Sequence, residues 1–350
     1  RKVLREKACQ KQKQKFSSSA VYQGCGYVEV MDALVEQVME PQRVQPRSVN
    51  IETFAWGYNG EDKLQGMSEM LQKMGITVNA YLPAADLQTI KKAPRAALNI
   101  VRRKKWALAM EQRFGTPFLH VADMQEWHGI EGISDLYRQI GKMLGCENAV
   151  ECVLQEEYER VVARYQELGA DFAKYKFCLI AHGIAYLPDA LRVYQQDYGL
   201  PITKICIIMN PSYQAETGLD DAMMQRFKDR IELAKAEYGC DAEILLEPSE
   251  DALREAAQSC DFVICNGHPR YAALDVPVLY NLFDRSVWSY QGFVDIMEEV
   301  WQMLQQPQRT GSNLLLSKLA YDPVFYPMRE ADKDSKASRE LYSRVWRQRK

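Results

Sequence analysis

The sequence lacks the features that mark membrane, secreted and nucleic-acid-binding proteins. No apolar run reaches the roughly 18 residues expected of a membrane-spanning helix. Residues 1–15 are basic and polar and do not form the apolar centre of a signal peptide. The 44 Lys and Arg residues and 47 Asp and Glu residues give a formal net charge of −3, which creates no general attraction for nucleic acid or an anionic membrane. We therefore expect a cytoplasmic protein that binds neither.

Disulfide and local metal-binding patterns are lacking too. The nine cysteines are an odd number spread through the chain, and no two have CxxC spacing. This argues against a disulfide framework, a structural zinc site and a local iron–sulfur motif. Cys178, Cys206 and Cys265 lie in apolar runs, which predicts that they are small core side chains. Cys25, between two glycines, is predicted to be the most exposed cysteine.

Three common active-site motifs are absent. There is no P-loop, and Gly24-Cys25-Gly26 lacks the third glycine of the dinucleotide-binding fingerprint, so no NAD or nucleotide site is expected. These glycines suit a tight strand-to-helix turn. No GxSxG sequence occurs, which argues against a hydrolase with a Ser-His-Asp triad.

What is present is a repeated alternation of apolar runs and amphipathic helical stretches, which predicts an α/β fold with parallel sheets. We expect two Rossmann-like lobes at residues 16–146 and 176–306, facing a central cleft and joined by a long helix at 147–175. A basic helical lead-in at 1–15 and a C-terminal tail at 307–350 complete the chain. Strands are predicted at 16–22, 48–55, 76–81, 96–101, 118–121, 176–181, 205–209, 242–246, 262–265 and 276–279.

One βαβ unit carries a cationic turn. The strand at 96–101 is followed directly by Arg102, Arg103, Lys104 and Lys105, and then by a helix that Gly115 ends. Ligands bind at the carboxyl ends of strands in open α/β sheets, and cations at a helix N-terminus oppose its dipole. The turn is either an anion-binding site or a solvated charged loop.

Polar turns follow three predicted strands of the second lobe. They are His182-Gly183, Asn210-Pro211-Ser212 and Asn266-Gly267-His268, and they suit a pocket rim on one sheet edge. His182 and His268 are candidate proton donors or metal ligands because imidazole titrates near neutrality. The alternative is that these are ordinary loop residues. His120 and His128 are interpreted as structural side chains.

The order of these elements resembles the nitrogenase component 1 proteins. The resemblance rests on SVNIETFAWGYNG at 48–60, LQKMGITV at 71–78, ALNIV at 97–101 and MEQRFGTPF at 110–118. It continues through CDFVICNGH at 260–268 and the segment at 276–293. That family includes the molybdenum–iron protein subunits, their cofactor-assembly scaffolds and the dark-operative protochlorophyllide reductase subunits.

The resemblance implies a cytoplasmic, oxygen-sensitive redox protein that forms a homo- or hetero-oligomer. It would receive electrons from an ATP-dependent iron–sulfur reductase. Arg103 and Leu282 stand where the family places its cofactor cysteine and histidine, which argues against a dinitrogen-reducing site. The family's cluster-binding cysteines lie mostly ahead of this chain's start. Cys25 is the remaining candidate metal ligand for an iron–sulfur cluster, and we expect an N-terminally truncated, divergent member.

Our hypothesis is an oxidoreductase subunit that binds a bulky anionic or metal-containing ligand, such as a carboxylated tetrapyrrole, between its lobes. The alternative is a non-catalytic scaffold or binding protein for a metal cofactor or metal chelate. A third possibility is that a partner subunit supplies the cluster ligands. The expected catalytic residues are His182 and His268, and the expected ligand-binding residues are Trp56, Tyr58, Arg102, Arg103, Asn210 and Asn266.

Overall fold

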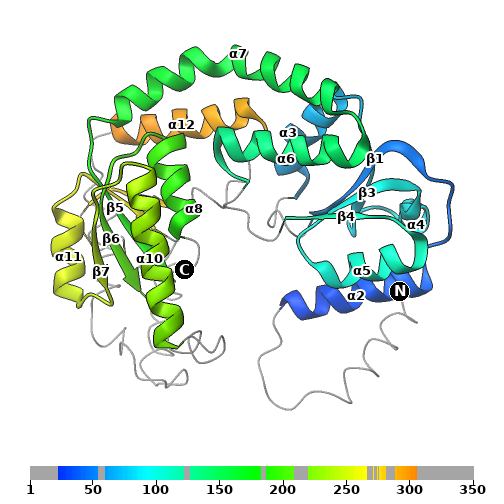
Figure 1. Cartoon of the computed structure of the whole chain (residues 1–350), viewed down its shortest axis with the longest axis horizontal. Helices are drawn as coiled ribbons and strands as arrows, with labels where there is room; N and C mark the ends of the chain where they lie inside the picture. The colour runs from blue at the N-terminus through cyan, green and yellow to red at the C-terminus, as the bar shows by residue number, and fades with distance from the viewer. Residues whose placement is uncertain are drawn as a thin grey trace, which may run out of the picture. The chain divides into compact units, whose positions relative to one another are not determined.

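The computed structural model describes residues 23–53, 60–121, 127–182, 187–208, 220–265, 271, 274, 276–280 and 288–305. The chain divides into two compact units, each with one parallel sheet in its described part (Figure 1). The first comprises Arg1–Val162 and Phe283–Phe293, and the second comprises Ala163–Leu282 and Val294–Lys350. The predicted α/β fold with two parallel sheets is confirmed.

The first unit has a four-stranded sheet in the order β2-β1-β3-β4. Figure 1 shows α2 and α5 on one side of this sheet and α3 and α6 on the other. The strands are β1 (Gln45–Glu52), β2 (Thr77–Leu82), β3 (Ala96–Val101) and β4 (Phe118–His120). The helices are α2 (Gln23–Gln37), α3 (Gly60–Lys73), α4 (Leu87–Lys91), the 3-10 helix η2 (Ala93–Arg95), α5 (Lys104–Phe114), α6 (Gly129–Leu144) and the first part of α7 (Glu147–Phe172).

Buried side chains hold α2 and α5 against the first sheet. Met31 and Val35 of α2 and Trp106 and Met110 of α5 pack in one cluster with Leu82 of β2. The strands are also joined by buried amides: Asn50 of β1 donates from Nδ2 to Asn99 Oδ1 on β3 at 2.8 Å. Burying apolar surface drives this packing, and the amide pair satisfies polar groups that would otherwise be buried without a partner.

The second unit has a five-stranded sheet in the order β7-β6-β5-β8-β9. Cys178, Cys206 and Cys265 lie in its core, as predicted, together with Leu253 and Ala257 of α11. The strands are β5 (Phe177–His182), β6 (Ile202–Ile208), β7 (Glu243–Leu246), β8 (Phe262–Cys265) and β9 (Val278–Tyr280). The helices are α8 (Leu187–Leu191), the π-helix η3 (Arg192–Asp197), α10 (Asp221–Glu237), α11 (Glu250–Gln258) and α12 (Tyr290–Gln305), with the end of α7.

Most predicted elements appear within a few residues of their expected bounds. β3 and β8 occupy the predicted 96–101 and 262–265. β1 begins before the predicted residue 48, because Gln45 pairs with Ala96 of β3. The short α4 was not predicted; Asp86 caps it by accepting hydrogen bonds from two backbone N–H groups. The lead-in, the strand at 16–22 and the C-terminal tail lie outside the described residues.

Among the described residues, no helix is both long enough and apolar enough to cross a bilayer.

Candidate functional site

The carboxyl ends of β1 and β3 lie next to each other, because these strands are neighbours in a parallel sheet. β1 ends at Glu52, and β3 ends at Val101, immediately before the cationic turn. The Glu52 side chain is 0% exposed. A carboxylate buried in this way needs hydrogen-bond donors and a positive partner to offset its lost hydration.

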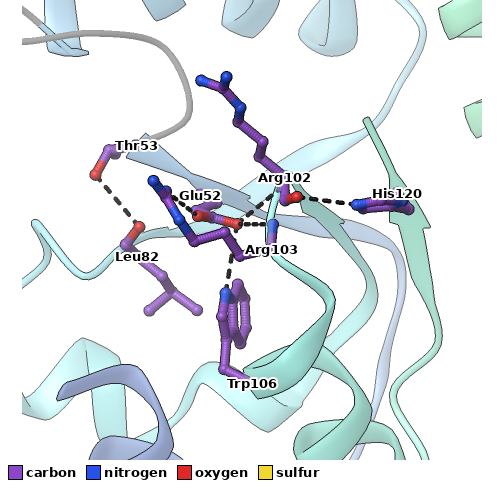
Figure 2. A network of polar contacts seen from close by, with 7 residues as sticks. All are labelled: Glu52, Thr53, Leu82, Arg102, Arg103, Trp106 and His120. Atoms are coloured by element: carbon purple, nitrogen blue, oxygen red, sulfur yellow. Dashed lines mark hydrogen bonds and ion pairs between the residues drawn. The ribbon is translucent and has the colours of Figure 1, made fainter. Parts of the chain in front are cut away.

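Glu52 obtains both from the turn between β3 and α5 (Figure 2). Its Oε2 accepts from the backbone N–H groups of Arg102 at 2.8 Å and Arg103 at 3.2 Å, and from Trp106 Nε1 at 3.3 Å. Its Oε1 lies 3.4 Å from Arg103 Nη1 in an ion pair. One carboxylate therefore joins the end of β1 to the turn after β3 and to the first turn of α5.

This contact explains how four consecutive cations can stand at a helix N-terminus. Arg103 occupies the N-cap position of α5 without a side-chain capping bond, and Glu52 supplies negative charge there from another strand. Lys105 has its own carboxylate partner, because its Nζ lies 2.5 Å from Asp32 Oδ2 on α2. The hydrogen bond with Asp32 raises the pKa of Lys105 above its ordinary value.

The two arginines of the turn differ in direction. The guanidinium of Arg103 points toward Glu52, whereas the side chain of Arg102 extends away from it (Figure 2). Arg102 is exposed, and its backbone carbonyl accepts a hydrogen bond from His120 Nε2 at 2.9 Å. Because a carbonyl only accepts, this contact requires the proton on Nε2. His120 thus holds the turn from β4, and Arg102 is the arginine that reaches outward.

The structure brings together only two of the predicted ligand-binding residues, Arg102 and Arg103, in its described part. His182 is the last residue of β5 and pairs with Ile208, which places its backbone at the strand end, while its side chain lies outside the description. Cys25 lies within α2, and its side chain is likewise outside the description. The remaining predicted positions fall outside the described residues: Trp56, Tyr58, Asn210, Asn266, His268 and Leu282.

Sequence reasoning missed Glu52 and Trp106. A signal for Glu52 was available: it is an acidic residue in a run that otherwise reads as a buried strand. Charged residues are almost never fully buried unless paired, so a cationic partner at a neighbouring strand end was to be expected. Nothing in the sequence identifies which of the four cations it pairs with.

The described residues of this turn do not fit an iron–sulfur cluster. Such clusters are held by thiolates, whereas Arg103 is a cation paired with Glu52. Across the described ranges, no three or more His, Cys, Asp and Glu side chains are grouped so as to hold a metal ion.

Comparison with known proteins points to one family. The family model described as nitrogenase component 1 type oxidoreductase matches residues 17–305. A light-independent protochlorophyllide reductase subunit from Zygnema circumcarinatum is 31% identical over 99 residues, which cover 27% of this chain and 18% of that protein. The subunit of the same name from a Synechococcus species is 30% identical over 114 residues, covering 31% and 22% respectively.

Two solved structures share the fold. The structure described as "Nitrogenase Cp1 at pH 5" matches with a TM-score of 0.56 and 15% identity, over 83% of this chain and 63% of that one. "Nitrogenase Cp1 at pH 6.5" matches with a TM-score of 0.55 and 15% identity, over 82% and 64%. The chain spans less than two thirds of both nitrogenase chains, and about a fifth of each reductase subunit is matched.

Proposed function

This chain belongs to the family of nitrogenase component 1 type oxidoreductases, and from that premise we propose that it is a subunit of a reductase for a bulky anionic substrate. The substrate class we propose is a carboxylated tetrapyrrole, bound at the carboxyl edge of the first sheet. Electrons would come from an ATP-dependent iron–sulfur reductase partner, and the subunit would work in an oligomer in the cytoplasm.

The observation that carries the substrate class is the direction of Arg102. Glu52 already accepts from the backbone N–H groups of Arg102 and Arg103, so an anion at this turn would be bound through a side chain. Arg102 is an exposed residue, and its side chain extends away from Glu52 (Figure 2). A planar guanidinium matches a carboxylate in geometry and charge. Arg103 would act by holding the turn through its ion pair with Glu52.

Two of the similar proteins support the same substrate class. Both are named as subunits of a light-independent protochlorophyllide reductase. Their substrate is by name a tetrapyrrole derivative, and the matched segments are 30–31% identical to this chain. A carboxylated tetrapyrrole combines a large apolar ring with negative charge, and it would use a cationic turn at a sheet edge for orientation.

The binding step is tested with a dicarboxylate porphyrin and its uncharged diester. We expect Arg102→Gln to weaken binding of the dicarboxylate about 10- to 100-fold, as the loss of one charge-assisted hydrogen bond implies. Binding of the diester should change little. Arg95→Gln is the matched control, since Arg95 is exposed just before β3, at its other end, and its loss changes the net charge equally. Equal weakening by both substitutions would count against a site at the turn.

The catalytic step is tested with the full-length protein, purified without oxygen, together with its iron–sulfur reductase partner. Turnover of a carboxylated tetrapyrrole that requires both ATP and a reductant is the expected result. Bound iron by elemental analysis, without turnover of any tetrapyrrole tested, would instead favour the scaffold function. The position of Arg103 gives that second function its support, because an arginine in an ion pair stands where the family places a cofactor-binding cysteine.

A further inference from the structure

Trp127 carries a buried indole N–H that the proposed function does not yet use. The residue is 3% exposed, and among the described residues its Nε1 has no hydrogen-bond partner. Two other tryptophans satisfy the same group: Trp106 Nε1 donates to Glu52 at 3.3 Å, and Trp301 Nε1 donates to Asp171 at 2.9 Å. A buried donor without an acceptor is rare and costly in folded proteins. An acceptor supplied by a ligand would relieve that cost.

The chain order places Trp127 at the carboxyl edge of the first sheet. It lies between β4 and α6, two residues before the helix begins. β4 runs parallel to β3, and the backbone N–H of Val121 donates to the carbonyl of Val101 at 2.7 Å, so the two strand ends are level. A helix that follows a strand in a parallel sheet begins at that carboxyl edge, where ligands bind. Trp127 therefore belongs to the same edge as Arg102, one strand away in the sheet order.

The surroundings of Trp127 favour an uncharged acceptor. A carboxylate brought into so buried a position loses its hydration and needs a counter-charge, whereas a carbonyl oxygen needs only a donor. The first turn of α6 carries an acidic residue, Glu131, which disfavours an anion there. The positive end of the helix dipole still favours the oxygen end of a carbonyl group. Protein atoms cover the Trp127 Nε1, so the acceptor displaces that cover as it enters.

From its burial, its missing acceptor and its position, we propose that Trp127 determines substrate specificity at the reductase site, by donating from Nε1 to a carbonyl oxygen on the ring system of the tetrapyrrole. This inference rests on the proposed function, because the same ligand meets Arg102. Arg102 binds the ligand through a carboxylate, and Trp127 recognises a neutral group on its apolar body. The substrate class is thereby narrowed to carboxylated tetrapyrroles that carry a ketone on the ring system.

Binding of paired porphyrins tests the contact. The probes are dicarboxylate porphyrins with a ketone at different ring positions, each paired with an analogue in which a methylene replaces the ketone. We expect the unsubstituted protein to bind one ketone about 3- to 10-fold more tightly than its analogue, as one neutral hydrogen bond implies. Trp127→Phe removes the N–H and keeps an aromatic ring, so it should abolish this preference. Trp301→Phe, in the second unit, is the control and should retain it.

The outcomes of this test separate the role of Trp127 from the proposed function. If the unsubstituted protein binds none of the porphyrins, both are overturned. If it binds them without preferring any ketone, or if Trp127→Phe retains the preference, the role of Trp127 is overturned and the site at Arg102 stands. Equal weakening of a ketone and its analogue by Trp127→Phe would show that the indole acts by packing, which also overturns its role as a donor.

Urea denaturation supplies a readout that needs no ligand. Trp127→Phe and Trp106→Phe remove the same atoms from buried positions, but only Trp106→Phe also takes a donor away from the buried carboxylate of Glu52. We expect the denaturation midpoint to fall further for Trp106→Phe than for Trp127→Phe, because an N–H without an acceptor contributes nothing to the folded chain. An equal or larger fall for Trp127→Phe would mean that its N–H is already satisfied, and the proposal would fail.

Discussion

Glu52 shows how much one buried carboxylate can do in this fold. It neutralises part of a cationic turn, accepts from the backbone amides ahead of α5, and ties Trp106 to the sheet edge. The same amides at a helix N-terminus would otherwise be a site for an external anion. An internal carboxylate in that position means that these two amides already have an acceptor.

Removing the charge of Glu52 tests this role. Glu52→Gln keeps the volume but replaces an acceptor oxygen with an N–H₂ group that faces donors, so we expect a loss of about 1–3 kcal/mol in the free energy of unfolding. Urea denaturation measures the loss. Glu69→Gln is the control, because Glu69 is exposed on α3 and accepts only from Gln65 at 2.9 Å among the contacts described. Its effect should stay within about 0.5 kcal/mol. Similar losses in the two variants would contradict the assigned role.

At the scale of the elements, buried amides set how the first sheet is assembled. Asn50 lies opposite Asn99 in the register between β1 and β3, and it also accepts from Asn79 Nδ2 on β2 at 2.8 Å. These three strands are therefore joined by side chains as well as by the backbone. A shift of register would leave buried amides without partners, which is costly.

Asn99→Ala tests this amide chain. It removes one of the two acceptors of Asn50 Nδ2, the other being the backbone carbonyl of Ala93, and we expect a loss of about 1–3 kcal/mol in the free energy of unfolding. Asn148→Ala offers a comparison, since Asn148 is exposed in α7, where alanine favours the helix. Chemical denaturation of the two variants should show that Asn99→Ala lowers the free energy of unfolding and that Asn148→Ala does not. A neutral result for Asn99→Ala would mean that the amides do not stabilise the register.

Two glycines provide a matched test of where backbone freedom matters. Gly115 ends α5 with φ of 73°, in the left-handed region, where alanine is strained. Gly169 lies inside α7, and a Cβ there would meet only Tyr198 O at 4.0 Å. Gly115→Ala should lower the free energy of unfolding by about 1 kcal/mol, and Gly169→Ala should raise it by up to about 1 kcal/mol. Effects of the same sign would contradict either the helix end at Gly115 or the helix interior at Gly169.

At the scale of the whole molecule, a segment that follows most of the second unit in the sequence belongs to the first unit. Phe283–Phe293 belongs with Arg1–Val162. Tyr290 Oη lies 2.6 Å from Ser134 Oγ on α6, across 156 residues of sequence. Tyr137 donates to the backbone carbonyl of Trp288, and both side chains are buried. The first unit is thus completed by a late segment of the chain.

A double-mutant cycle measures the interaction between Ser134 of α6 and Tyr290 of the late segment. Ser134→Ala and Tyr290→Phe each remove the same hydrogen bond, so their combined effect on the free energy of unfolding should fall short of the sum by about 0.5–2 kcal/mol. Ser134→Ala combined with Ser249→Ala is the control, because Ser249 caps α11 in the second unit and shares no described partner with Ser134. That pair should be additive. Additivity in the first pair would show that the segment is not held as described.

The prediction of elements succeeded where the signal is local. The run at 96–101 is apolar, a cationic turn follows, and Gly115 ends the helix, so strand and helix were predicted close to their observed bounds. Periodicity and a left-handed glycine are properties of neighbouring residues. The α4 helix was missed because a five-residue helix carries too little periodic pattern to be recognised.

The candidate site was predicted only in part, because its contacts join distant parts of the chain. Arg102 and Arg103 were expected to meet a ligand, since the turn after a strand is where ligands bind in such sheets. Their partnership with Glu52 crosses 50 and 51 residues of sequence. No local pattern specifies which carboxylate reaches the turn, so the arginines could not be given separate roles from the sequence.

The sequence by itself determined the alternation of strands and helices, the cationic turn, and the resemblance to a family, because each depends on short-range patterns and their order. Only the tertiary structure decided that β1 and β3 are neighbours, that Glu52 occupies the turn, and that the sulfur atoms of Cys178 and Cys206 lie 3.9 Å apart. The physical reason is shared by all three. Charge, proton affinity and reactivity depend on which groups are brought together out of water, and that is decided by packing.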